Sequence, residues 1–362
     1  MIHISRHLLT LFLFILSCSH AFAQAQQAEY SRPKVALVLG GGGAKGAAEV
    51  GVLKYIEQSG VPVDIVVGTS IGSIVGGLYS VGYRSEQLDS MFRSQEWLNL
   101  FTGRKTKYGR NPIEKEDSVT YIFGFPIKNN RNRAATRSGN GRDSAAERSG
   151  GRGGHGMLRG DSIVNMLDKM IGLPGNVDFD SLPIPYRCVA VDMEPFEEVV
   201  LRRGNLARAM RASMAIPLAF RPEKIDGMSL ADGGLLNNLP VDVAKQMGAD
   251  IIIAVDLTVN KHENYEGLSD MFSSLKDLPM HNLFRWAMDR PDLKKYHENV
   301  KAADIYINPQ LKGYDATDFR QEKIERMISI GEEAGKQALP QLLELKKKIQ
   351  EGVNGNDASW RR

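Results

Sequence analysis

The sequence predicts an α/β protein, a three-layer α/β/α sandwich with a mostly parallel central sheet. Two observations lead to this prediction. Most of the strand candidates are continuous apolar runs, which are typical of strands covered on both faces. Helical patterns lie between these runs, and strands that alternate with helices along a chain usually form parallel sheets. The chain shows no internal repeats, so we expect one domain that spans residues 34–350.

The N-terminal residues are expected to precede this domain. Residues 1–23 have the pattern of a cleavable signal peptide, because an apolar run at residues 8–18 is followed by Ala-Phe-Ala at residues 21–23. The run is shorter than the roughly 20 residues that a membrane-spanning helix needs. Residues 24–33 would then be a short linker, and the protein would be exported to the periplasm or the medium. Lipoprotein processing at Cys18 is the alternative.

Each element of the domain follows from an apolar run or from a helical period. Cys188, the one cysteine left after cleavage, lies in a strand candidate and is expected to be a small buried hydrophobic residue. Strands are expected at Val35–Leu39, Val63–Val67, Arg187–Val191, Glu198–Leu201, Met228–Ala231, Ile251–Asp256 and Asp304–Ile307. Helices are expected at Ala44–Ser59, Ile71–Val81, Gln87–Phe92, Ser162–Ile171, Leu206–Met214 and Val241–Met247, and an amphipathic pattern at Phe319–Ile349, interrupted by Pro340, precedes a tail at residues 351–362.

The first two strands fix the place of a site. A strand, a glycine-rich loop, a helix and a second strand form a right-handed crossover in nearly all proteins, so both strands should be parallel and adjacent. The residues after Leu39 and those after Val67 then lie on the same edge of the sheet. Ligand sites in open α/β sheets gather at this carboxyl-end edge.

The second strand runs into Gly-Thr-Ser-Ile-Gly, which predicts a nucleophile elbow at Ser70. In this motif a sharp turn between a strand and a helix pushes the serine oxygen out of the surface. Gly68 and Gly72 flank the serine, where a side chain would collide with neighbouring backbone. The competing interpretation is that Ser70 only caps the helix that begins at Ile71.

The first strand runs into a glycine loop that could serve one of two ligands. Residues 41–46 satisfy G-x-G-x-x-G, the dinucleotide fingerprint, but that fingerprint also needs an acidic residue at the end of the second strand. Asp64 lies near the beginning of that strand instead. We therefore expect the backbone N–H groups of this loop to form an oxyanion hole beside Ser70; the family resemblance described below narrows them to those of Gly41, Gly42 and Gly43. A nucleotide-binding protein remains the alternative.

A serine nucleophile needs a base, and Asp232 is the better candidate. An apolar strand delivers this aspartate to its end, and Gly233 and Gly234 then allow a tight turn. A shielded aspartate can act as a base if its pKa lies near the working pH. A plain Asp-Gly turn and a hydrolase triad that uses a histidine are the alternatives. The three C-terminal histidines lie in polar segments and are expected at the surface: His262, His281 and His297.

A basic segment interrupts the pattern of strands and helices. Residues 128–160 have a net charge of +6 in a chain of net charge +3, so the rest of the chain is net negative. The segment has almost no apolar residues, and we expect a disordered insertion at about residues 128–155. It is either a solvated loop or an arm that contacts anionic membrane surfaces. No aromatic residues interleave with the arginines, so a nucleic-acid partner is not expected.

Four stretches together resemble the patatin-like phospholipases: GGGGAKGAAEVGVL, GTSIGSIVGGLYS, RASMAIPLAF and DGGLLNNLPVD, in this order. The resemblance covers roughly residues 34–256. It implies a patatin-like fold and an enzyme that hydrolyses lipid or phospholipid esters without a metal or another cofactor. It also implies that Ser70 is the nucleophile, that Asp232 is the base of a dyad without histidine, and that residues 41–43 form the oxyanion hole. A lipid-binding module of the same fold without catalytic activity is the alternative function.

The motif glycines match the family's pattern, while two residues depart from it. Lys45 replaces an arginine that is common in the family, and it keeps the charge but loses the planar guanidinium. Glu49 stands where many bacterial members have histidine. Neither change affects the predicted dyad. The matching glycines outside the oxyanion hole are Gly46, Gly68, Gly72, Gly233 and Gly234.

Overall fold

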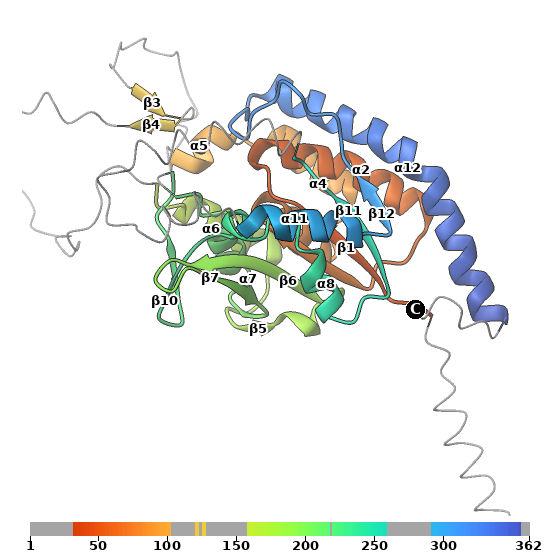
Figure 1. The fold of residues 1–362 in the computed structure, drawn as a ribbon. Coiled ribbons are helices and arrows are strands. Elements are labelled where there is room, and N and C mark those ends of the chain that lie inside the picture. Colours follow the sequence, from red (N-terminus) through yellow and green to blue (C-terminus); the bar gives the residue numbers. More distant parts are fainter. Residues whose placement is uncertain are drawn as a thin grey trace, which may run out of the picture.

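The computed structural model describes residues 32–102, 120–122, 125–127, 158–217, 219–258 and 291–355. These residues form a mixed sheet that lies between two layers of helices (Figure 1), which confirms the predicted α/β/α sandwich. Within them the main sheet has 8 strands in the order β12-β11-β1-β2-β6-β10-β9, with β7 paired to β6. The strands from β12 to β6 are parallel, whereas β7 and β10 run antiparallel to β6 and β9 runs antiparallel to β10.

The strands and helices expected from the sequence are all present, with ends that differ by a few residues. The sheet strands are β1 (Val35–Leu39), β2 (Ile65–Thr69), β6 (Tyr186–Asp192), β7 (Glu197–Leu201), β9 (Glu223–Ile225), β10 (Met228–Asp232), β11 (Ile251–Val255) and β12 (Ile305–Ile307). Two short pairs lie outside this sheet: β3 (Thr120–Ile122) with β4 (Phe125–Ile127), and β5 (Val177–Asp178) with β8 (Arg203–Gly204). The α-helices are α2 (Ala47–Ser59), α3 (Ile71–Ser80), α4 (Ser85–Ser94), α5 (Trp97–Thr102), α6 (Asp161–Ile171), α7 (Leu206–Ser213), α8 (Val241–Gln246), α11 (Pro291–Ala302) and α12 (Gln321–Gly355).

The core lies on both faces of the sheet, as the alternation of side chains along β1 demonstrates. Val35, Leu37 and Leu39 point into the larger buried cluster, which residues of α2, α3, α4, α7 and α12 complete. Ala36 and Val38 point into a smaller cluster on the other face, which α8 and α11 cover. All five β1 side chains are fully buried, as expected for a central parallel strand.

Helix α12 corrects one expectation. The sequence predicts an interruption at Pro340, yet the helix runs without a break from Gln321 to Gly355, past the expected start of the tail at residue 351. A proline inside a helix removes one hydrogen bond and bends the helix, but it does not always end it. Figure 1 shows α12 bending partway along its length. Helix α12 packs against α2.

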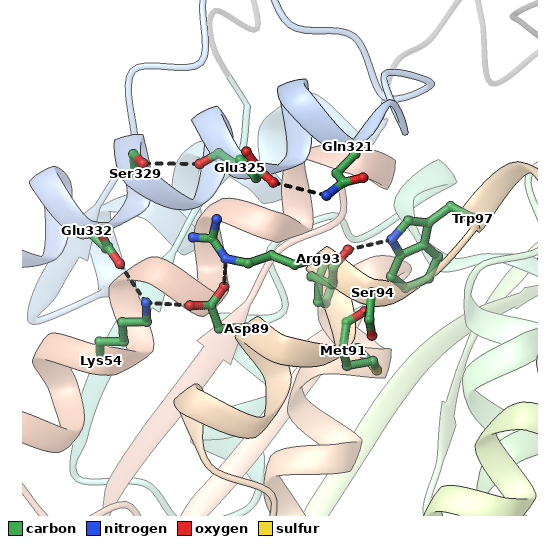
Figure 2. Close-up of polar contacts among 11 residues, drawn as sticks. Lys54, Asp89, Met91, Arg93, Ser94, Trp97, Gln321, Glu325, Ser329 and Glu332 are labelled. Carbon is green, nitrogen blue, oxygen red and sulfur yellow. Dashed lines mark hydrogen bonds and ion pairs between the residues drawn. The ribbon is translucent and has the colours of Figure 1, made fainter.

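The contact between α2 and α12 is close and holds the start of α2 in place. A methyl group at Gly331 would lie 1.9 Å from the carbonyl oxygen of Ala48, so only glycine fits there. Lys54 of α2 also forms ion pairs with Asp89 of α4 (2.7 Å) and Glu332 of α12 (2.6 Å), as Figure 2 shows. The glycine loop before α2 is thereby attached to a rigid pair of helices.

Several expectations concern residues outside the described ranges. They are the signal peptide at residues 1–23 with Cys18, most of the linker at residues 24–33, the basic insertion at about residues 128–155, and His262 and His281. Cys188 is described, and it is free and fully buried, as expected. Across the described ranges, the helices are all too short or too polar to cross a membrane.

Candidate active site

Ser70 lies on the sharp turn between β2 and α3. Its backbone angles, φ 55° and ψ −123°, are unusual for a residue other than glycine, and such backbone costs about 1–3 kcal/mol. Hydrogen bonds hold the turn in this shape: the Ser70 N–H donates to Ser213 Oγ (2.9 Å), and Ser73 Oγ donates to the Ser70 carbonyl (2.6 Å). A methyl group at Gly72 would lie 2.5 Å from the carbonyl oxygen of Leu39, which explains the glycine after the serine.

The Ser70 hydroxyl group points to Asp232. Its Oγ donates to Asp232 Oδ2 at 2.7 Å, across 162 residues of sequence. Ser70 occupies the N-cap position of α3, but its side chain makes no capping hydrogen bond, so the capping interpretation does not account for it. The side chain is almost completely buried.

The register of β6 explains why these two residues meet. This strand lies between β2 and β10, and it places Thr69 beside Val189 and Asp232 beside Ala190. The end of β2 and the end of β10 therefore reach neighbouring positions, although β10 runs antiparallel to β6.

The two carboxylate oxygens of Asp232 have different partners. Oδ2 accepts from Ser70 Oγ, and Oδ1 accepts from the Gly234 N–H at 2.8 Å. The Asp-Gly turn weighed as an alternative is therefore present, and it orients the carboxylate toward the serine. Burial raises the pKa of Asp232 to about 6, against the opposing effect of the hydrogen bonds from Ser70 and Gly234.

The glycine loop differs from expectation at one residue. The Gly41 N–H donates to the Asn238 carbonyl (3.0 Å), and Asn238 Nδ2 donates to the Gly41 carbonyl (3.1 Å), so Gly41 cannot serve an oxyanion. Within the described ranges, the N–H groups of Gly42 and Gly43 have no hydrogen-bond partner. Gly43 has φ +58°, and a methyl group there would lie 2.3 Å from the carbonyl oxygen of Ala316. Of the three N–H groups expected to form an oxyanion hole, those of Gly42 and Gly43 are therefore the two that are not engaged by another group of the described chain.

Of the two residues that depart from the family's pattern, Lys45 lies in the glycine loop and Glu49 lies in the first turn of α2. Glu49 is fully buried, and neither of its carboxyl oxygens has a hydrogen-bond partner within the described chain. Burial raises the pKa of Glu49 well above its usual range, and the charge of Asp256 raises it further. Burial lowers the pKa of Lys45, while the charges of Asp315 and Asp256 act in the opposite direction. Burial therefore favours the protonated form of the Glu49 carboxyl group.

A small apolar cavity lies beside Ser70. Its volume is about 30 Å³, and Ser70 and Gly43 form one wall of it. The other walls come from α3, α5, α6, the segment after α7 and the segment before α12. The larger side chains among them are Ile74, Trp97, Met214, Phe220 and Phe319.

The candidate histidines do not reach the dyad in the described chain. His297 is exposed on α11, the helix that covers the face of the sheet with the smaller buried cluster. His262 and His281 lie outside the described ranges. Two supporting residues, Ser213 and Asn238, were given no role from the sequence. Both lie in the stretches that resemble the family, and that position was the only available signal.

The motif glycines lie where the chain is most crowded around the dyad. A methyl group at Gly41 would lie 3.1 Å from Ser70 Cβ and 2.3 Å from Asn238 Oδ1. The remaining motif glycines have a neighbour within 2.7 Å of an added methyl group: Gly46, Gly68, Gly233 and Gly234.

A family model and several known proteins match this chain. The family model of the patatin-like phospholipases matches residues 37–245, which include the elbow, the loop and Asp232. The mouse "Patatin-like phospholipase domain-containing protein 6" is 30% identical over 320 residues, which are 83% of this chain and 20% of that protein. An uncharacterized NTE family protein of Mycobacterium bovis is 33% identical over 227 residues, 63% of this chain and 50% of that protein.

The described structure is also similar to the crystal structure of VipD from Legionella pneumophila. The TM-score is 0.43 at 14% identity, over 86% of this chain and 67% of VipD. This chain spans about a fifth of the mouse relative's length and half of the mycobacterial one's. Since the family model covers more than half of the sequence, the chain belongs to the patatin-like phospholipase family.

Proposed function

We propose that the protein is a serine acyl hydrolase that cleaves fatty-acyl esters of lipids, as a phospholipase A, a lysophospholipase or a lipid esterase. The observation that supports this most is the 2.7 Å hydrogen bond from Ser70 Oγ to a buried Asp232 with a raised pKa. A serine hydroxyl is a weak nucleophile until a neighbouring base takes its proton. Asp232 is ionised above about pH 6, so it is a base near neutral pH.

In the proposed first half-reaction, Ser70 Oγ attacks the ester carbonyl and its proton passes to Asp232 Oδ2. The carbonyl oxygen becomes an oxyanion, which accepts hydrogen bonds from the Gly42 and Gly43 N–H groups. As the tetrahedral intermediate collapses, the bond to the alcohol breaks and the alcohol oxygen takes the proton from Asp232. The acyl group stays on Ser70 as an ester.

In the second half-reaction, water attacks this ester and gives a proton to Asp232. The intermediate collapses, the fatty acid leaves, and the proton returns to Ser70 Oγ. Ser70 and Asp232, which exchange the proton in these steps, lie in one hydrogen-bond network with Ser213 and Gly234.

The apolar cavity beside Ser70 supports a lipid substrate. A hydrocarbon chain gains about 0.8 kcal/mol for each methylene that it buries, and the cavity walls are nearly all apolar. Release of fatty acid from phospholipid vesicles by the purified chain, and none by Ser70→Ala, is the expected result. Vesicle binding without release by either protein would instead favour the lipid-binding module, and equal release by both would mean that Ser70 is not the nucleophile.

We further propose that the protein is exported and that its basic segment, residues 128–160, contacts anionic membrane surfaces. The signal-peptide pattern at residues 1–23 and the net charge of +6 in that segment support this. N-terminal sequencing of the mature protein should begin at Gln24, whereas a lipoprotein would begin at Cys18. Deletion of residues 128–155 should reduce sedimentation with anionic vesicles, and unchanged sedimentation would refute the membrane role.

A further inference from the structure

The cavity beside Ser70 is too small to enclose the whole of a long acyl chain. Its volume is about 30 Å³, whereas an apolar cavity that binds a benzene molecule has a volume of about 150 Å³. The Ser70 hydroxyl and Gly43 lie at the cavity, so an acyl group bound there enters with its carbonyl carbon next to the nucleophile. The length of chain that fits is therefore set by the side chains that fill the rest of the space.

Trp97 is the largest side chain that lines the cavity. It is the first residue of α5 and is 2% exposed. Its indole Nε1 donates to the Phe92 carbonyl near the end of α4, at 3.0 Å. Its ring lies 5.0 Å from the Phe92 ring and 5.8 Å from the Phe319 ring, measured between centroids. The ring contacts with Phe92 and Phe319, together with this hydrogen bond, hold the indole in position.

The elements on both sides of the indole are themselves anchored. Asp89 of α4 pairs with Lys54 of α2, and the Arg93 guanidinium donates to the same carboxylate (Figure 2). On the other side, the Ala316 carbonyl accepts from the Ala44 N–H of the glycine loop at 2.8 Å, three residues before Phe319. A substrate chain that pushes against the indole therefore pushes against α4 and the start of α12.

Several of the other walls belong to the proposed catalytic scaffold, whereas α6 and the segments that contain Phe220 and Phe319 line the cavity from outside it. Ile71 and Ile74 lie on the helix that follows Ser70, Met214 follows Ser213, and Gly43 is an oxyanion donor in the proposed mechanism. A change in any of these moves the reacting groups. Trp97 lines the cavity from outside this scaffold, so its side chain can set the size of the cavity independently of the chemistry.

We propose that Trp97 is the residue that determines acyl-chain length, because its indole fills the space that a longer chain would need. This proposal rests on the proposed ester hydrolysis and makes it more specific. The protein favours short acyl chains, and a smaller residue at position 97 shifts the preference toward longer ones. Each additional methylene that an apolar pocket accepts changes kcat/KM by about tenfold or more.

The test compares p-nitrophenyl butyrate and p-nitrophenyl laurate as substrates of the full chain. In Trp97→Leu, the ratio of kcat/KM for laurate to that for butyrate should rise at least about tenfold. Trp97→Phe, which keeps a ring of intermediate size, should give a smaller rise in the same direction. Phe179→Leu is the matched control, because Phe179 is also a fully buried aromatic residue and does not line the cavity. The control should leave the ratio unchanged.

A binding measurement keeps the proposal testable even if a variant is unstable or slow. In the Ser70→Ala background, laurate should raise the melting temperature of Trp97→Leu by more than it raises the melting temperature of the protein with Trp97 intact, each relative to its own ligand-free value. An unchanged ratio in both Trp97 variants, or equal laurate binding with and without Trp97, would overturn the proposal. If the native chain hydrolyses neither ester, the proposed function fails instead, and laurate binding then decides about Trp97 alone.

Discussion

Ser213 is predicted to keep the nucleophile in its strained conformation, and Ser213→Ala tests this. The Ser213 Oγ accepts from the Ser70 N–H (2.9 Å) and donates to the Val189 carbonyl (2.6 Å). It is fully buried, so water cannot replace the lost hydroxyl without a rearrangement. The substitution leaves one N–H group and one carbonyl without this partner.

The magnitude follows from these two contacts. A buried polar group that loses its partner costs about 1–3 kcal/mol, so the free energy of unfolding should fall by about 2 kcal/mol. The backbone at Ser70 stores a similar amount of strain, about 1–3 kcal/mol, which the chain can release once the hydrogen bond is gone. A relaxed turn moves Oγ away from Asp232. Since 1.36 kcal/mol corresponds to a factor of ten in rate, kcat should fall about tenfold or more.

Ser59→Ala separates the positioning effect from the loss of stability. Ser59 is also fully buried, and its Oγ likewise bridges two backbone groups, the Ile56 carbonyl (2.6 Å) and the Val61 N–H (3.2 Å). It lies at the far end of α2, about 18 Å along the helix from the glycine loop. Urea denaturation should show similar losses for both variants, and only Ser213→Ala should lose kcat on p-nitrophenyl butyrate. Equal kcat for Ser213→Ala and the native chain would refute the positioning role.

Three further predictions concern the dyad, the buried Glu49 and the oxyanion donors. Activity requires ionised Asp232, so kcat/KM should fall tenfold for each pH unit below about 6; a profile without this acidic limb would contradict the role of Asp232. Glu49 has a folded-state pKa above its unfolded value, so its stabilising contribution is complete below about pH 4.3 and is lost as the pH rises toward the folded pKa. The stability of Glu49→Gln relative to the native chain should therefore increase with pH above about 4.3, by up to about 1.4 kcal/mol per unit, and a difference that does not depend on pH would show that Glu49 is ionised in the folded protein. In Gly43→Ala, the methyl group would lie 2.3 Å from the Ala316 carbonyl oxygen, so the backbone must shift and carry the N–H group out of position. We expect kcat to fall by about 100-fold or more, the usual effect of losing one oxyanion donor. Gly172→Ala is the control and should retain full activity, because Gly172 has a similar φ of +61° but no atom within 4 Å of the added methyl group.

Patterns that are local in the sequence predicted most of the fold and the central pair of the site. The turn at Ser70 follows from one strand, one helix and two glycines, and the position of Asp232 follows from an apolar strand that ends in Asp-Gly-Gly. These signals hold because the conformation of a tight turn depends on the residues within it.

Features that depend on contacts between distant segments could not be predicted. From the sequence pattern, the Gly41 N–H group is expected to be available to an oxyanion. The fold brings the Asn238 carbonyl to this N–H group, and the sequence gives no sign of that contact. The role of Ser213 depends in the same way on the register of β6 with β2. Trp97 has no motif around it, and the cavity that it lines is built from segments up to 276 residues apart, from Gly43 to Phe319. Helix α12 continues through Pro340 and packs against α2, a contact between distant segments that the sequence pattern does not reveal.

The central claim is that Ser70 is a nucleophile activated by Asp232. The most direct test is to incubate the full chain with an alkyl fluorophosphonate at pH 7 and to locate the covalent adduct by mass spectrometry. The account predicts one adduct on Ser70, no adduct in Ser70→Ala, and much slower labelling in Asp232→Asn, while Ser59→Ala is labelled at the native rate. An adduct on another residue, or labelling of Asp232→Asn at the native rate, would contradict it.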